Sequence, residues 1–212
     1  MQSQIQQKPI FIPIINHSWT PNHNSILIVK KWFDELYGPS VCKLLETSQI
    51  NSLQFEEYIK GLTEGRETVC FYICLHGKQY INKETGKPEE FLLLNSSFKI
   101  KDEELTRIIN DIKFKNLYIF IESCHGGGLL NMIKIDDKTK SMANVNVVIF
   151  NVCSKEQKCY VQINGGQTIG LVTGILNKYQ MNPFRTPEKG LELIKRIYPT
   201  LDSKVTIMKN LS

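Results

Sequence analysis

The chain has 212 residues, of which 42% are hydrophobic and 22% are charged, as in folded globular proteins. This composition excludes disordered, collagen-like and coiled-coil proteins, and the length favours one domain over residues 1–212 whose core needs no disulfide or structural metal. The net charge of +5 is mild and dispersed. Because no basic run forms a stripe, nucleic acid is not an expected partner.

The start of the chain predicts a cytoplasmic protein. Residues 1–8 have neither the charged region nor the apolar region of a secretory signal, and we expect them to form a frayed end. No apolar run approaches the roughly 18 residues that a membrane span requires, so no membrane partner is expected. The six cysteines are therefore predicted to be thiols: Cys42, Cys70, Cys74, Cys124, Cys153 and Cys159.

Apolar runs of strand length recur along the chain, and most lack the polar alternation of a sheet with one wet face. They are Ile10–Ile15, Thr68–Leu75, Leu117–Ile121, Val145–Val152 and Val205–Met208. Each is predicted to be a strand buried on both faces. A shorter pair, Val41–Leu45 and Phe91–Leu94, predicts one further strand and a small hairpin.

Between these runs, apolar residues repeat at helical spacing. The sets are Val29, Trp32, Phe33 and Leu36; Phe55, Tyr58, Ile59 and Leu62; Leu105, Ile108, Ile109 and Ile112; Val172, Ile175, Leu176 and Tyr179; and Leu191, Ile194 and Tyr198. Alternating strands and helices predict an α/β sandwich, with a mainly parallel sheet covered by helices on both faces.

Reactive side chains follow two of the predicted strands. One strand runs into residues 74–77, Cys-Leu-His-Gly, and another runs into residues 122–128, Glu-Ser-Cys-His-Gly-Gly-Gly. In a parallel sheet such groups meet beyond the carboxyl ends of the strands, where the loops form a crevice. A thiol at Cys124 that enters a Gly-rich turn and a helix start would have a lowered pKa.

An imidazole beside that thiol would complete a nucleophile and a base. His76 would either deprotonate Cys124 or protonate a leaving amine, as in cysteine hydrolases. The backbone amides of Gly77 and Cys124 are the candidate oxyanion hole, since a glycine leaves its N–H open to a substrate oxygen.

Other interpretations of these residues remain open. A lone histidine often serves only as a hydrogen-bond donor, and a lone buried cysteine is usually an inert small hydrophobe. Cys70, Cys74 and His76 share strand parity, but their spacing differs from the C-x2-C knuckle of structural zinc sites, so no metal is expected. His125 is a rival base, although a direct neighbour of Cys124 tends to point elsewhere.

At these strand ends the sequence resembles the caspase-like cysteine peptidases, a clan that includes caspases, metacaspases and legumains, and is most similar to metacaspases. His76 and Cys124 are 48 positions apart, close to the spacing of about 50 in caspase-type sites. The motifs that carry the resemblance are His76-Gly77, Phe91–Leu94, Ile100–Leu105, Ile121–Gly126 (similar to D-x-C-H-S-G), Val152–Gln157 and Gly165–Gly170.

The resemblance implies a caspase-like sheet of about six strands, a dyad of His76 and Cys124, and peptide hydrolysis through an acyl-enzyme. The chain also departs from the family. Glu122 stands where most metacaspases have Asp, although legumain-type relatives also use Glu. Asn131 stands where many metacaspases place an Asp tied to calcium. No cofactor is therefore expected, and calcium activation is not expected either.

The pocket for the P1 side chain is expected to be acidic. In caspases the position of Glu122 holds a Gln that helps to grip Asp, whereas a carboxylate would bind Arg or Lys through a charge-assisted hydrogen bond of about 1.5 to 3 kcal/mol. Glu156 is either a second specificity acid, as the family implies, or a solvated loop charge. The loop Asn16–Ser25 has no acid, so an Asn preference like that of legumain stays open.

Residues 131–144 form a polar connector between the two halves of the chain. It is either an ordinary loop or a site of self-processing. Cuts after the connector lysines would favour a basic P1 preference, and cuts after its aspartates would favour a caspase-type pocket. These residues are Lys134, Lys138 and Lys140, and Asp136 and Asp137.

Two functions fit these patterns. The first is a cytoplasmic cysteine endopeptidase that acts on proteins or peptides. The second is a catalytically silent module that binds a partner peptidase or adaptor. Because both His76 and Cys124 are present, the peptidase is favoured. The sequence does not define an oligomeric state.

Overall fold

A computed structural model describes residues 7–16, 23–86, 88–123, 145–152, 161–164, 167–200 and 203–209. The predicted connector 131–144, the predicted Gly-rich turn and helix start after Cys124, and residues 1–6 of the predicted frayed end lie outside these ranges. Among the described residues, no helix is both long enough and apolar enough to cross a bilayer.

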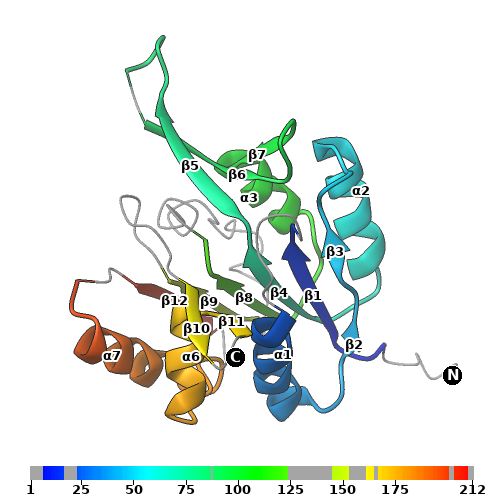
Figure 1. Ribbon diagram of the computed structural model, residues 1–212. Coiled ribbons are helices and arrows are strands. Elements are labelled where there is room, and N and C mark those ends of the chain that lie inside the picture. Colours follow the sequence, from blue (N-terminus) through cyan, green and yellow to red (C-terminus); the bar gives the residue numbers. More distant parts are fainter. Residues whose placement is uncertain are drawn as a thin grey trace, which may run out of the picture.

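The central sheet has the strand order β12-β9-β8-β4-β1-β2, and β3 also pairs with β1 (Figure 1). Neighbouring strands run parallel, except that β12 is antiparallel to β9. Because β2 pairs with the start of β1 and β3 with its end, the two follow one another along one edge of β1 and fill a single strand position. The sheet therefore has six strand positions, and the prediction is confirmed. The strands are β1 (Ile10–Ile15), β2 (Val41–Cys42), β3 (Leu45–Glu46), β4 (Thr68–Cys74), β8 (Asn116–Ile121), β9 (Asn146–Asn151) and β12 (Lys204–Lys209).

Helices cover both faces of this sheet (Figure 1). Helices α2 (Ser52–Thr63) and α3 (Asp102–Asn110) pack on one face, and α1 (His23–Tyr37), α6 (Leu171–Lys178) and α7 (Pro187–Ile197) pack on the other. Each predicted apolar set begins inside one of these helices. The α/β/α sandwich is therefore confirmed.

The unbroken apolar runs are explained by β1, in which all six residues are buried. Successive side chains of a strand point to opposite faces. Ile12 and Ile14 thus join the core cluster under α2 and α3, while Phe11 and Ile15 join the cluster under α1, α6 and α7. A strand with two covered faces has no polar positions to alternate with.

Local signals also place the helix ends. Asn51 and Gln54 form a capping box at the start of α2, with each side chain accepting a hydrogen bond from the other residue's backbone N–H. Three acidic residues, Asp102, Glu103 and Glu104, occupy the first turn of α3, where they complement the positive end of the helix dipole.

A second, antiparallel sheet is formed by β5 (His76–Ile81), β6 (Pro88–Leu93) and β7 (Lys99–Lys101) and projects from the sandwich (Figure 1). Only Leu75 separates β4 from β5, so His76 begins a new strand instead of ending a core strand. Val41–Leu45 contributes to two short strands where one was predicted. A further pair, β10 (Val161–Asn164) and β11 (Gln167–Gly170), is antiparallel.

Candidate active site

The register between β4 and β8 aligns the two segments that lead toward His76 and sequence position 124. The pairing runs from Thr68 beside Asn116 to Ile73 beside Ile121, so each residue of β4 lies beside the residue 48 positions later. Two hydrogen bonds continue this alignment past the strand ends.

The first of these bonds runs from the Glu122 N–H to the Ile73 carbonyl, at 2.9 Å. The second runs from the Leu75 N–H to the Ser123 hydroxyl, at 3.2 Å. Leu75 and Ser123 are both buried. These bonds hold the chain leaving β4 against the chain leaving β8, immediately before sequence positions 76 and 124.

His76 is the first residue of β5 and pairs with Leu93 of β6. Its side chain is exposed, whereas the neighbouring Gly77 is buried and pairs with Leu92. His76 thus lies just beyond the carboxyl end of β4 and is open to solvent. Cys124 and Glu156, and with them the rival base His125, lie outside the described residues.

Glu122 is the third predicted site residue that the structure describes, after His76 and Gly77, and it is only 4% exposed. Its carboxylate accepts hydrogen bonds from Tyr72 and Thr173, and the Val172 backbone N–H is a further donor. The Tyr72 hydroxyl donates to Oε2 at 3.0 Å, the Thr173 hydroxyl donates to Oε2 at 2.7 Å, and the Thr173 N–H donates to Oε1 at 3.1 Å.

Burial raises the pKa of Glu122, while the Thr173 and Tyr72 donors act in the opposite direction and stabilise the charged form. The carboxyl group is therefore a buried acid with both oxygens bonded. Its predicted contact with the P1 side chain remains a prediction.

The bonds around Glu122 continue to helix α1. The Tyr72 hydroxyl is hydrogen-bonded to the Ser25 side chain, and the Gly170 N–H donates to the Ser25 hydroxyl at 3.0 Å. Burial raises the pKa of Tyr72 well above its usual value. A Cβ atom at Gly170 would come closer than 3.0 Å to the Glu122 carboxyl group.

This network could not be predicted from the sequence. Tyr72 and Thr173 lie 50 and 51 positions from Glu122, so no local pattern connects them. The usable signal was polarity: Tyr72 and Thr173 carry hydroxyl groups inside otherwise apolar runs, and a buried hydroxyl requires a partner. Ser25 follows a polar stretch and carries no such signal.

Cys70 and Cys74 lie on the same face of β4 as Tyr72 and are buried in the apolar cluster under α1, α6 and α7. Burial raises the pKa of Cys70 well above its usual value, which keeps that thiol protonated. Among the residues that the structure describes, no three His, Cys, Asp or Glu side chains are grouped as metal ligands.

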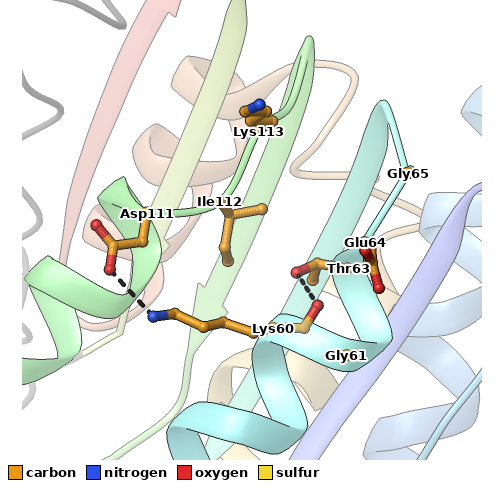
Figure 2. Close-up of a pocket in the computed structure, with 8 residues that line it drawn as sticks. All are labelled: Lys60, Gly61, Thr63, Glu64, Gly65, Asp111, Ile112 and Lys113. Atoms are coloured by element: carbon orange, nitrogen blue, oxygen red, sulfur yellow. Dashed lines mark hydrogen bonds and ion pairs between the residues drawn. The ribbon is translucent and has the colours of Figure 1, made fainter.

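A hollow of about 550 Å³ lies elsewhere, between the end of α2 and the segment after α3. Thr63, Gly65, Asp111 and Lys113 are among the residues that line it (Figure 2). These segments lead into the amino ends of β4 and β8. The hollow therefore lies at the sheet edge opposite to His76, whereas α/β sheets bind ligands at the carboxyl ends of their strands.

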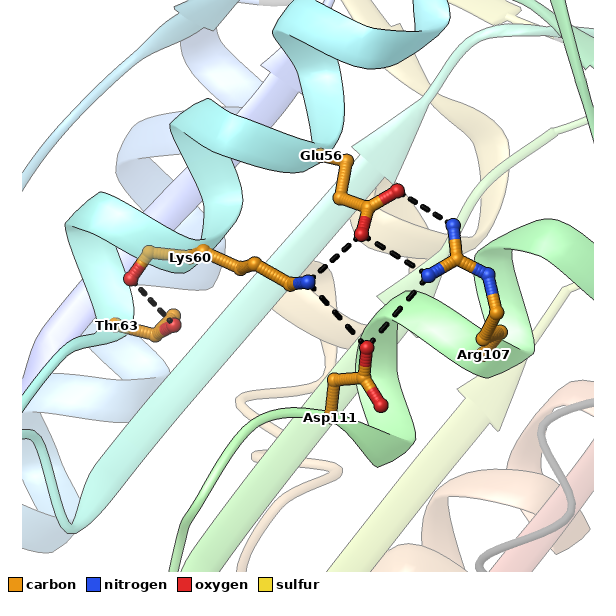
Figure 3. Close-up of polar contacts among 5 residues, drawn as sticks. All are labelled: Glu56, Lys60, Thr63, Arg107 and Asp111. Carbon is orange, nitrogen blue, oxygen red and sulfur yellow. Dashed lines mark hydrogen bonds and ion pairs between the residues drawn. The ribbon is translucent and has the colours of Figure 1, made fainter.

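Four charged side chains beside this hollow join α2 to α3 (Figure 3). Arg107 donates to both oxygens of Glu56, at 2.9 and 2.5 Å. Lys60 lies 2.7 Å from Glu56 and 3.4 Å from Asp111. Together Arg107 and Lys60 lower the pKa of Glu56 to about 2. This cluster fixes the packing of two helices on the outer surface.

No protein-family model matches the chain. No curated protein matches it either.

Solved structures, however, are similar to it in fold. The protein GSU0716 from Geobacter sulfurreducens superimposes with a TM-score of 0.60 at 13% identity, over 97% of this chain and 94% of that chain. Caspase-1 from Spodoptera frugiperda superimposes with a TM-score of 0.53 at 11% identity, over 96% of this chain and 86% of that chain. The chain therefore has a caspase-like fold, and at these identities the likeness extends to the fold alone.

Proposed function

We propose that this chain is a cysteine endopeptidase in which Cys124 and His76 form the catalytic dyad. The observation that carries the proposal is the register of β4 with β8. Its offset of 48 residues equals the separation of the two reactive residues. The bond between Leu75 and Ser123 lies one residue before each of them. This register supports a dyad that forms beyond the carboxyl ends of the two strands.

The proposed reaction needs no cofactor. The Cys124 thiolate attacks the scissile carbonyl carbon, and the carbonyl electron pair moves to an oxyanion held by the Gly77 and Cys124 amides. His76, having taken the thiol proton, gives it to the departing amine as the C–N bond breaks. Water then attacks the resulting thioester while His76 accepts its proton, and the thiolate leaves. An exposed imidazole at His76 suits this exchange of protons with substrate and water.

The likeness to caspase-1 supports a peptidase at the level of fold. The finer assignment, a metacaspase-like enzyme of the cytoplasm, rests on the resemblance of residues 121–126 to D-x-C-H-S-G and on the need to keep a catalytic thiol reduced. A silent interaction module that binds an adaptor is the alternative. It is disfavoured because the chain keeps both reactive residues.

The proposed P1 preference is for Arg or Lys. It rests on the negative charge of Glu122, with Glu156 as a second acid. Both oxygens of the Glu122 carboxylate already accept hydrogen bonds from Tyr72 and Thr173. A P1 cation would therefore share this carboxylate with those donors. The charge still attracts cations and repels an acidic side chain. Preferred cleavage after Asn or Asp would contradict the proposed P1 preference.

Active-site labelling tests the dyad. We expect a chloromethylketone directed to Arg or Lys to form an adduct on Cys124 that is detectable by mass spectrometry. Cys124→Ala should abolish the adduct, and His76→Ala should slow its formation. The absence of an adduct from folded protein, with any P1 residue, would favour the silent module.

A P1-positional substrate library tests specificity. Run with and without calcium, it should show faster cleavage after Arg and Lys, with the same rates in both conditions. Preferred cleavage after Asp or Asn would contradict the prediction of an acidic P1 pocket. A requirement for calcium would contradict the interpretation of Asn131.

A further inference from the structure

We propose that the buried chain of Ser25, Tyr72, Glu122 and Thr173, which we call the Glu122 clamp, is a positioning device for the nucleophile. It fastens the segment that enters Cys124 to the first turn of α6. The inference rests on the proposed peptidase function and adds positioning residues to it.

The clamp joins four separate elements of the fold. Ser25 lies in α1, Tyr72 in β4, Glu122 directly after β8, and Thr173 in the first turn of α6. All four side chains are buried. Burying these polar side chains costs desolvation free energy that apolar side chains at the same positions would not cost. We therefore infer that the network has a function at the end of β8.

The hydrogen bonds of the clamp converge on one carboxylate. The Gly170 N–H donates to Ser25 at 3.0 Å, Ser25 is bonded to Tyr72, and Tyr72 donates to Glu122 at 3.0 Å. Thr173 donates from both its hydroxyl and its N–H. That N–H belongs to the first turn of α6, whose amides have no partner within the helix. In a dry interior such bonds are strong and hold a single geometry.

The position of Glu122 in the sequence connects the clamp to the proposed nucleophile. Glu122 is two residues before Cys124, and the intervening Ser123 accepts the N–H of Leu75 at 3.2 Å. Glu122 is thus tied to α6, while Ser123 is tied to the chain that leads into His76. Both residues that precede the nucleophile are fastened, each to a different part of the fold. A displacement of about 1 Å at a reacting group can reduce its rate about a hundredfold.

The clamp also differs from a P1 contact in what its loss should do. A P1 ligand changes the rates of basic substrates relative to the others. A positioning residue changes the rates of all substrates by the same factor, because it acts on the nucleophile. Thr173 and Tyr72 are neutral, so replacing them removes no charged side chain from the pocket.

The test compares Thr173→Val, which lacks the hydroxyl, with Thr173→Ser, which keeps it. The readout is the rate of Cys124 labelling by chloromethylketones with Arg, Asn or Asp at P1, measured on protein shown to be folded by circular dichroism. We expect Thr173→Val to slow each detectable reaction by the same factor, about tenfold or more. Thr173→Ser should stay within about twofold of the wild type.

The pH profile supplies a readout that general loss of stability would not move. Removing a donor raises the pKa of the buried Glu122 carboxyl further, because its charged form loses a hydrogen bond. The acidic limb of the labelling rate in Thr173→Val should therefore move to higher pH, and Thr173→Ser should restore it.

Tyr118→Phe is the matched control. The Tyr118 hydroxyl lies on the same strand, β8, but is bonded to Tyr37 and Asn146 at 2.8 and 2.7 Å, away from Glu122. It should destabilise the fold without changing the labelling rate of folded protein. If Thr173→Val does not fold, Tyr72→Phe removes the other hydroxyl donor and should give the same uniform loss.

Wild-type rates in Thr173→Val or Tyr72→Phe, or a loss confined to the Arg reagent, would overturn the clamp while leaving the peptidase intact. A wild-type protein that no reagent labels would instead refute the peptidase and, with it, the clamp's role.

Discussion

Gly170 precedes helix α6 with a φ of −57°, a value open to any residue. Its backbone therefore does not require glycine, but the space beside it does. A Cβ atom there would lie closer than 3.0 Å to the carboxyl carbon and both oxygens of Glu122. Gly170→Ala consequently forces the carboxylate out of its hydrogen-bonded position or moves the start of the helix.

The cost follows from what holds the carboxylate in place. Tyr72 and Thr173 supply three hydrogen bonds, and losing one bond to a charged group costs about 1.5 to 3 kcal/mol. Overpacking of the surrounding side chains adds about 1 to 3 kcal/mol. We therefore expect Gly170→Ala to lower the free energy of unfolding by about 2.5 to 6 kcal/mol, as measured by urea denaturation.

Gly61→Ala is the matched control, since a Cβ at Gly61 in α2 would have no atom within 4 Å. It should stabilise the protein by about 0.5 to 1 kcal/mol, because alanine favours a helix. The decisive comparison repeats Gly170→Ala in a Glu122→Ala background, where its cost should fall below about 1 kcal/mol. Equal costs in the two backgrounds would refute the steric reasoning.

Two more substitutions test contacts away from the site. Asn95 donates to the carbonyls of Thr47 and Ile50 and accepts two backbone N–H groups, so Asn95→Ala should cost about 2 to 4 kcal/mol in urea; a loss below about 0.5 kcal/mol would contradict these contacts. Arg107→Ala should lower the free energy of unfolding only slightly, because the Arg107 side chain is half exposed and solvent screens its ion pair with Glu56. Since the pKa of Glu56 falls from 4.5 to about 2, that contribution should be present above pH 4.5 and vanish as the pH falls through about 2; an unchanged acid limb in Arg107→Ala would refute it.

The core of the sheet was predictable because its signal is local. The unbroken apolar run of β1 is buried from Ile10 to Ile15, as predicted. The same logic gave β4 and β8 to within one residue at each end. A strand covered on both faces is apolar throughout, so it can be recognised from its own residues without knowing which strands lie beside it.

The surroundings of the site were less predictable because they depend on contacts distant in sequence. Strand β5 was missed because its residues Lys78 and Gln79 are polar, and its partner β6 alone makes it a strand. Tyr58 and Tyr179 fit the apolar spacing of helices yet are about half exposed. The spacing of residues along a helix does not show how far neighbouring elements cover its apolar face. The bonds that join Glu122 to Tyr72 and Thr173 could not be inferred for the same reason.

The most direct test of the proposed dyad is the pH dependence of Cys124 alkylation by iodoacetamide, followed residue by residue by mass spectrometry. Cys42 serves as a reference in the same chain, because it is exposed and a reagent can therefore reach it. Its pKa is raised by desolvation, so its thiol stays protonated at low pH. We expect Cys124 to react at pH 6, where Cys42 does not, and to lose this reactivity in His76→Ala. Equal reactivity of the two thiols across pH, unchanged in His76→Ala, would contradict a thiolate activated by His76.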